Sequence, residues 1–289
     1  MTVTDTRTLS VPGATVTYDV HPAATASAHP PLLVFGSPME AAAFGTLIGH
    51  FTDRTVLTYD PRGTGRSPQD DPLAAGDPAR HAADLQAVLD DAGVGPVDIF
   101  ATSGGAVNAL AWIAGHRPKV RTLVAHEPPT AQFSPDREIV ESVVADIADT
   151  YQAHGEGPAM AKFIALVSAE GPLPPTYLDA PAPDPAAFGL PAEDDGSRTS
   201  ALLGLNMRTC TPYVHDLDAL GGAATRVVIA TGAGSGQQFA ARGAEAFAVA
   251  AGLEQVVLPG DHTGFLGGEY GQYGEPDAFA AALHQILDD

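Results

Sequence analysis

The sequence predicts an α/β protein in which a mostly parallel sheet is covered by helices on both faces. Short apolar runs alternate with helical patterns between residues 30 and 126, and the alternation returns after residue 225. Glycine, proline and aspartate mark the junctions between these runs. The chain has 289 residues, of which 45% are hydrophobic, so it can bury a large core as an ordinary globular protein does.

The strands of the first half are marked by short apolar runs. Residues 8–20 alternate apolar and polar side chains around Pro12-Gly13, which predicts a hairpin or two edge strands. Further buried strands are predicted at residues 30–35, 54–60, 97–102 and 120–126. Because helical segments separate them, these strands should run parallel and be covered on both faces.

Two helices are predicted between those strands. Asp77-Pro78 begins the first, since aspartate caps a helix N-terminus and proline fits its first turn, and Gly93 ends it. The second helix, at residues 104–116, directly follows the strand at residues 97–102. A serine therefore stands at a strand-to-helix turn.

The alternation stops after Pro128-Pro129. We expect helices within residues 131–168, a loop rich in proline, alanine, aspartate and glycine at 171–197, and a helix at 198–210. Strands then return at 225–231 and 254–259, and helices at 236–251 and from Pro276. The prediction is a core made of residues 1–130 and 216–289, with a mainly helical cap at 131–215 inserted after the sixth strand.

Composition excludes several classes of partner. The net charge is -21, from 35 acidic and 14 basic residues, so the surface repels nucleic acid and anionic lipid. Cys210 is the only cysteine, which rules out an intrachain disulfide and fits a reducing compartment. The N-terminal stretch has no signal-peptide pattern, and no apolar run approaches the ~20 residues of a membrane span. We expect a cytoplasmic protein that binds a small molecule; its oligomeric state is not indicated.

The stretch "FATSGGAVNALA" contains the candidate nucleophile, Ser103. Ala101 lies two residues before it and Gly105 two residues after it, and only small residues fit around a serine on such a strained turn. The helix that begins at Gly104 also directs backbone N–H groups toward this point. The alternative is a polar residue in a glycine-rich loop without chemistry.

A serine nucleophile needs a base, which a third group orients. His262, in "LPGDHTGF", lies four residues past Leu258 at the C-terminal end of the last strand, where ligands bind in open α/β sheets. Alone, it would more simply be a surface or core histidine. Its place after Ser103 in the chain favours the role of base.

Four motifs resemble one family. "VFGSP", "YDPRGTGRS", "ATSGGA" and "GDHTGF" occur in this order and are similar to the α/β-hydrolase superfamily, especially the cap-bearing lactonases, esterases, epoxide hydrolases and haloalkane dehalogenases. The resemblance extends from residue 8 to 287. It implies an α/β-hydrolase fold with a cap and, without a cofactor, cleavage of an ester or lactone through an acyl-enzyme on Ser103, with His262 as base.

Ser103 argues against epoxide hydrolase and dehalogenase chemistry, because those relatives use an aspartate at this position. Two alternatives stay open. One is carbon–carbon bond hydrolysis, acyl transfer or rearrangement on the same scaffold. The other is a catalytically inactive homologue that encloses a small apolar ligand.

The oxyanion site departs from the family pattern, which usually has His-Gly where this chain has Phe35-Gly36. The resemblance still implies the backbone N–H groups of Ser37 and Gly104 as oxyanion donors, since a backbone donor does not depend on the side chain. Phe35 favours an apolar site mouth. The candidates for contact with substrate are Phe35, Met39, Phe163 and Val167, although a buried cap core explains the last two equally well.

The family's usual acid is also missing. An aspartate normally follows the strand at 225–231, but Ser235 occupies that position, and no carboxylate occurs between Gly232 and Ala244. Some dehalogenase-like and zearalenone-lactonase-like members take their acid from the strand after the nucleophile's helix. That strand ends here at Glu127.

By this resemblance Glu127 accepts a hydrogen bond from the Nδ1–H group of His262. The alternative for Glu127 is a solvated side chain before the Pro-Pro turn. Asp261 is adjacent to His262 in sequence and should point away from it. Asp216 and Asp218 could serve only by an unusual route.

Two other site classes are not supported. "YDPRGTGRS" lacks the Gly-Lys-Ser/Thr ending of a phosphate loop, so we interpret it as a turn braced by Asp60 and Arg62. The sequence contains no H-E-x-x-H, no paired cysteines and no two histidines at helical ligand spacing. We therefore expect neither a metal nor a cofactor.

Overall fold

The computed structural model describes residues 4–71, 74, 76–116, 119–191 and 193–289. Its sheet has eight strands in the order β1-β2-β4-β3-β5-β6-β7-β8. The strands are β1 (Asp5–Val11), β2 (Ala14–His21), β3 (Leu32–Ser37), β4 (Val56–Asp60), β5 (Val97–Ser103), β6 (Val120–His126), β7 (Arg226–Gly232) and β8 (Glu254–Leu258). The pairs β1–β2 and β2–β4 are antiparallel and all others are parallel. The predicted hairpin and the mostly parallel sheet are confirmed.

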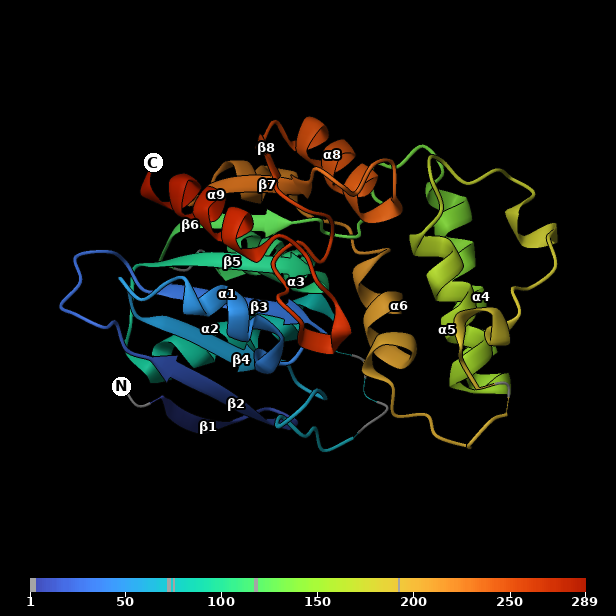
Figure 1. Ribbon diagram of the computed structural model, residues 1–289, viewed down its shortest axis with the longest axis horizontal. Coiled ribbons are helices and arrows are strands. Elements are labelled where there is room, and N and C mark those ends of the chain that lie inside the picture. The colour runs from blue at the N-terminus through green and yellow to red at the C-terminus, as the bar shows by residue number, and fades with distance from the viewer. Residues whose placement is uncertain (1–3, 72–73, 75, 117–118, 192) are drawn as a thin grey trace.

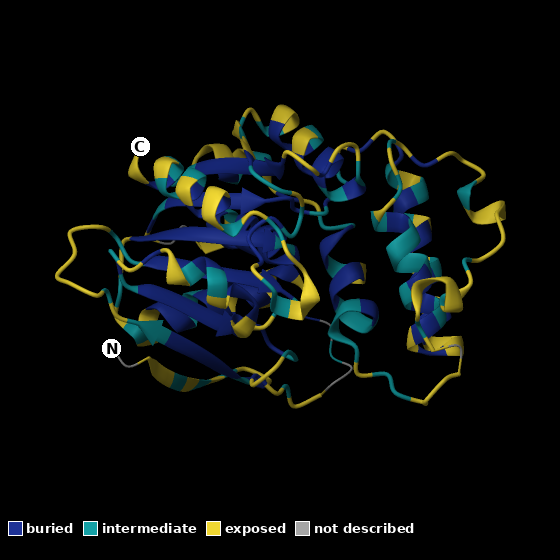
Figure 2. Ribbon diagram, in the orientation of Figure 1, coloured by how far each residue is buried: buried dark blue, intermediate teal, exposed yellow. Residues whose placement is uncertain are grey.

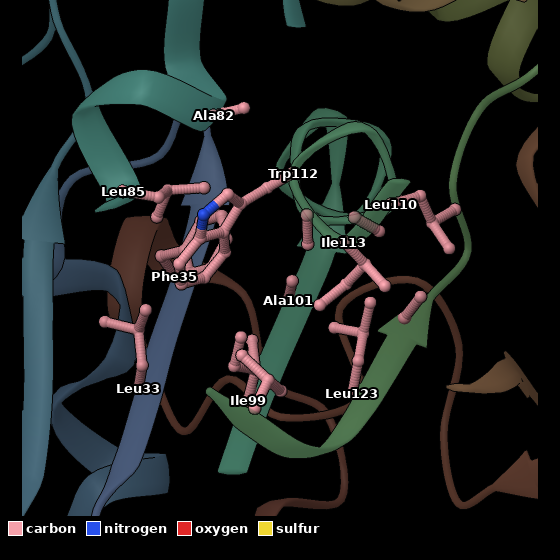
Figure 3. Close-up of a cluster of buried hydrophobic side chains, with 14 of the residues drawn as sticks. Leu33, Phe35, Ala82, Leu85, Ile99, Ala101, Leu110, Trp112, Ile113 and Leu123 are labelled. Atoms are coloured by element: carbon pink, nitrogen blue, oxygen red, sulfur yellow. The ribbon is translucent and has the colours of Figure 1, made fainter. Parts of the chain in front are cut away.

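Helices cover both faces of the sheet (Figure 1). On one face, α2 (Pro78–Ala92), α3 (Gly104–His116) and α8 (Phe239–Ala251) contribute to a buried cluster that contains Leu33, Phe35 and Trp112 (Figure 3). On the other face, α1 (Gly45–Gly49) and α9 (Pro276–Asp288) pack against Leu32, Val34 and Phe100. Successive side chains of β3 enter opposite clusters because a strand alternates its faces.

The ends of α2 follow the predicted signals. The Asp77 carboxylate accepts from the backbone N–H of Arg80, and Gly93 adopts the left-handed conformation that ends the helix. The short helices α1 and α7 (Leu217–Gly221) were not predicted. Each has five residues, too few for a periodic pattern to be visible.

Residues 137–210 form what we call the helical insertion. It contains α4 (Arg137–His154), α5 (Glu156–Val167), a π-helical turn (Leu202–Asn206) and α6 (Met207–Cys210). Between α5 and the π-helical turn, the described residues form two short 3-10 turns, at Tyr177–Asp179 and Pro185–Phe188. In Figure 1, α4 and α5 stand beyond the end of the sheet, with α6 between them and the strands. The insertion has its own apolar cluster, which Phe239 of α8 joins.

Burial follows these layers. Figure 2 shows the central strands buried, with the exposed residues on the outer sides of the helices and in the connecting loops. No helix in the described part of the chain is long and apolar enough to span a membrane.

The turn after β4 corrects one interpretation. Asp60 braces the turn, but its partner is Arg66, whose backbone N–H and Nε both donate to Oδ2 at 2.8 Å. Arg62 instead donates through Nε to the buried Asp84 carboxylate of α2 at 2.7 Å. Gly65, with φ of 53°, turns the chain so that the next side chain faces Asp60 while Arg62 points toward α2.

Three histidines are buried and uncharged at neutral pH. Burial lowers the pKa of His81 and His126 to about 4 and that of His215 to about 3. His215 is 3% exposed, its ring packs against Phe247 with centroids 5.0 Å apart, and neither ring nitrogen has a hydrogen-bond partner among the described residues. When the protein unfolds below about pH 6.5, the usual histidine pKa, these buried rings therefore become protonated.

We expect His215→Phe to make the protein less sensitive to acid. The pKa of His215 is lower in the folded than in the unfolded protein. The contribution of this histidine to the free energy of unfolding is therefore complete above pH 6.5 and is lost as pH falls toward 3. Between pH 7 and pH 5 the variant should lose about 2 kcal/mol less of its free energy of unfolding than wild type does. Urea denaturation at the two pH values measures this, with the exposed His154→Gln as control. Equal losses in wild type and His215→Phe would contradict the prediction.

Candidate active site

Ser103 is the last residue of β5 and α3 begins at the next residue. Its φ is 56°, a left-handed conformation that is strained for a serine. Ser37, at the end of β3, lies beside it in the strand register. A Cβ on Gly105 would come within 2.8 Å of the Gly36 backbone, so only glycine lets α3 begin this close to β3. The small-residue pattern around Ser103 thus has a steric cause.

Glu127 directly follows β6 and is 1% exposed, so it is not a solvated side chain. Its φ of 46° is also left-handed, and its carboxylate is held at both oxygens. Oε2 lies 2.6 Å from Nδ1 of His262, and Oε1 accepts the backbone N–H of Gly232 at 2.7 Å. The end of β7 and the loop after β8 therefore converge on this one carboxylate.

The charge of Glu127 sets the proton position on His262. Burial alone would raise the pKa of Glu127, but the hydrogen bond and the charge interaction with His262 lower it to about 2. The carboxylate is therefore ionised at neutral pH and can only accept, so Nδ1 of His262 carries the proton. In the neutral ring, Nε2 is then left as an acceptor. Ser235, which stands at the family's usual acid position, is itself 1% exposed.

His126 is a feature of the site that the sequence analysis missed. Its Nδ1 lies 3.0 Å from Oγ1 of Thr102, and its ring stacks on that of His262 with centroids 5.9 Å apart. Burial lowers its pKa to about 4, so an uncharged ring lies beside His262. Its position beside Glu127 at the end of a buried strand was the only signal in the sequence.

A cavity of about 590 Å³ opens over this cluster. Ser103, Glu127 and His262 line it at the end of the sheet, and most of its apolar wall comes from the helical insertion and the start of α8: Val144, Phe163, Leu166, Val167, Leu202, Met207 and Phe239. Among the described residues that line the cavity, none is lysine or arginine. The wall is thus apolar, and the charged groups at its base and rim are acidic.

Two of the four predicted substrate contacts line this cavity, and two do not. Phe163 and Val167 lie in its wall. Phe35 is fully buried in the core, with its ring 5.3 Å from that of Tyr59, because its place in β3 directs it toward α2 and α3. Met39 folds over Gly36, with its Sδ 3.0 Å from where a Cβ of that glycine would lie, and packs on the opposite cluster.

The other acidic candidates lie apart from the histidine. Asp261 is exposed at the rim, and its Oδ1 accepts from the backbone N–H and hydroxyl of Thr263. Asp216 caps α7 by accepting from the backbone N–H of Ala219. Within the described ranges no three His, Cys, Asp or Glu side chains gather as they would to hold a metal ion.

Comparison with known proteins agrees with this architecture. The family model described as the alpha/beta hydrolase fold matches residues 38–182, about half of the chain. A curated relative, the "Uncharacterized hydrolase YraK" of Bacillus subtilis (strain 168), is 27% identical over 295 residues, covering 97% of this chain and 95% of the relative.

Solved structures share the fold. A thermophilic esterase from Thermogutta terrifontis is similar with a TM-score of 0.66 and 18% identity, over 98% of both chains. The enol-lactonase from Burkholderia xenovorans LB400 also has a TM-score of 0.66, with 15% identity, over 98% of this chain and 100% of that one. The chain belongs to the α/β-hydrolase fold family and is a hydrolase of that fold.

Proposed function

We propose that this hydrolase cleaves a carboxylic ester or lactone of a small, mainly apolar molecule through an acyl-enzyme on Ser103. One observation carries the proposal: the Glu127–His262 pair and the strained Ser103 open into the same apolar cavity. The esterase and the enol-lactonase among the similar structures support the reaction class.

The proposed reaction begins when Nε2 of His262 takes the proton of Ser103 as Oγ attacks the carbonyl carbon. The backbone N–H groups of Ser37 and Gly104 hold the negative oxygen of the tetrahedral intermediate. His262 then gives its proton to the departing alkoxide, which leaves an acyl-enzyme. Water, deprotonated by His262, attacks this ester. The intermediate then releases the acid as His262 returns the proton to Oγ of Ser103. Ionised Glu127 stabilises the imidazolium in both steps.

Residues 131–215 are the proposed cap in this scheme. The helical insertion supplies most of the apolar wall, while the residues of the reaction come from the ends of β5 and β6 and from the loop after β8. This division places the acyl or alcohol chain of the substrate against the insertion and its carbonyl against the sheet.

The experiment that tests the function combines turnover with trapping. Wild-type protein is incubated with p-nitrophenyl hexanoate and with a medium-chain δ-lactone, and the intact mass is recorded after an acid quench. We expect release of product and a hexanoyl adduct on the protein. Absence of turnover, together with no reaction with a fluorophosphonate, would contradict the proposal.

The cavity predicts selectivity by charge. A carboxylate at the far end of an acyl chain would meet no cation among the described lining residues, and an uncompensated buried charge is costly. We expect kcat/KM for the mono-p-nitrophenyl ester of adipic acid to be about 100-fold below that for p-nitrophenyl hexanoate.

The matched variants are Val167→Arg and Val167→Gln, which add a long side chain to the cavity wall with and without a charge. Val167→Arg should narrow the difference between the two esters by about tenfold, whereas Val167→Gln should leave it nearly unchanged. If wild-type protein has the same kcat/KM for both esters, the acyl chain of the substrate does not enter this cavity.

A further inference from the structure

We infer that Asn206 supplies a third donor to the oxyanion, from the helical insertion. The inference rests on the proposed ester cleavage at Ser103. Asn206 is the last residue of the π-helical turn Leu202–Asn206, directly before α6. Such turns are rare in proteins and are frequent at functional sites.

The Asn206 side chain reaches both residues that carry the proposed backbone donors. Its Nδ2 donates to Oγ of Ser37 at 2.8 Å. A Cβ on Gly104 would lie 2.8 Å from its Oδ1 and 3.0 Å from its Nδ2, so the carboxamide rests directly on Gly104. Asn206 also lines the cavity that contains Ser103. One carboxamide thus lies against both halves of the proposed oxyanion site and faces the substrate space.

The chemistry of a carboxamide suits this place. Its NH₂ group carries two protons, and the hydrogen bond to Ser37 uses one of them. That bond also fixes the orientation of the group, and Asn206 is only 9% exposed, so water screens it little. A fixed donor in such a site stabilises the negative oxygen of the intermediate more than the neutral carbonyl of the bound ester. Its effect should therefore fall on kcat rather than on KM.

The position of Asn206 also couples the insertion to the reaction. The two backbone donors belong to the sheet and to α3, whereas Asn206 comes from a segment between β6 and β7. Cys210, one turn further along, contacts the same place, with its Sγ 3.9 Å from the carbonyl oxygen of Gly104. The oxyanion site is complete only while this part of the insertion is docked on α3.

The test compares Asn206→Ala and Asn206→Asp with Thr209→Val. Asn206→Asp keeps the shape and the contact with Ser37 but offers no N–H group. Thr209 does not line the cavity. Its Oγ1 lies within hydrogen-bond distance of three carbonyl oxygens, those of Leu205 at 3.1 Å, Asn206 at 3.2 Å and Gly76 at 3.2 Å, so Thr209→Val removes a hydroxyl from the same turn while leaving the Asn206 carboxamide in place. Each protein is assayed with p-nitrophenyl hexanoate for kcat and KM. Each is also titrated with a trifluoromethyl ketone, which forms a tetrahedral adduct, and with the matching methyl ketone.

We expect both Asn206 variants to lower kcat about 100-fold with KM changed less than about threefold, as on removal of one oxyanion donor. The trifluoromethyl ketone should bind about 100-fold more weakly and the methyl ketone nearly as before. Thr209→Val should stay close to wild type. If Asn206→Ala does not fold cooperatively, Asn206→Leu, which is similar in size, has no N–H group and adds no charge beside the oxyanion, takes its place.

Three results would overturn the inference while leaving the proposed function intact: kcat within about threefold of wild type, an effect confined to KM, or equal weakening of both ketones. A different result separates the two proposals. If wild-type protein neither turns over the ester nor forms an adduct, the proposed function fails and the inference fails with it.

Discussion

Replacement of Ser103 by alanine should lower kcat for ester cleavage by about 10⁶-fold, the largest effect of any single change proposed for this chain. The variant keeps the cavity and the Glu127–His262 pair but has no oxygen to form the acyl-enzyme. Any acceleration that the variant still gives over the uncatalysed reaction in water comes from the oxyanion donors and substrate binding alone. Steady-state hydrolysis of p-nitrophenyl hexanoate measures the loss.

Fluorophosphonate labelling with intact-mass detection isolates the chemical cause. Wild-type protein should gain one adduct, and Ser103→Ala none. The control is Ser142→Ala, which removes an exposed serine of α4 whose hydroxyl donates to the Glu138 carbonyl oxygen. It should label like wild type. An adduct on Ser103→Ala would place the nucleophile elsewhere and contradict the proposed mechanism.

Replacement of Glu127 by glutamine should lower kcat by about 10⁴-fold while the protein stays folded. The amide is nearly isosteric and can still accept the Gly232 N–H at its oxygen. Its NH₂ group would then face Nδ1 of His262, where it favours the wrong tautomer and no longer stabilises the imidazolium. Turnover of the same ester gives the rate, and circular dichroism reports the fold.

The pH profile gives a second measurement on Glu127. Because the pKa of Glu127 is about 2, the wild-type carboxylate stays charged as pH falls well below neutral. Titration of Glu127 itself should therefore contribute no change in the wild-type rate between about pH 5 and pH 8.

Asp261→Asn is the comparison for Glu127→Gln, because it neutralises the other carboxylate that lines the cavity. Asp261 makes its hydrogen bonds to Thr263, and the His262 ring is oriented by Glu127. The Asp261→Asn variant should therefore lose far less activity than Glu127→Gln. The reverse order of the two variants would assign the acid to Asp261.

Local sequence signals determined the elements that carry the site. The Asp77-Pro78 start and Gly93 end of α2 were predicted because a capping carboxylate and a left-handed glycine act within one turn of chain. The strands were predicted from apolar runs, since burial on both faces demands them. The turn at Ser103 followed from small neighbours, which the close approach of α3 to β3 requires. The first two features depend on neighbours in sequence or on composition, and the third was visible because a tertiary contact leaves a local pattern of small residues.

Tertiary structure alone decided which side chains meet. Nothing in the strand "PPLLVF" shows which face of the sheet Phe35 occupies, and the packed sheet directs it into the core, away from the cavity. Arg62 and Arg66 have the same chemistry, and only the turn at Gly65 and the nearness of α2 assign Asp84 to one and Asp60 to the other.

The neighbours of the reacting groups were hidden for the same reason. His126 stacks on the ring of His262, which is 136 residues away in sequence. Asn206 donates to the hydroxyl of Ser37, which is 169 residues away. Such pairs leave no periodic pattern, because their spacing is set by how the strands are ordered and where the insertion docks. The sequence by itself determined the strands, the longer helices and the residue types of the proposed site, and the packing of the insertion on the sheet decided the surroundings of those residues.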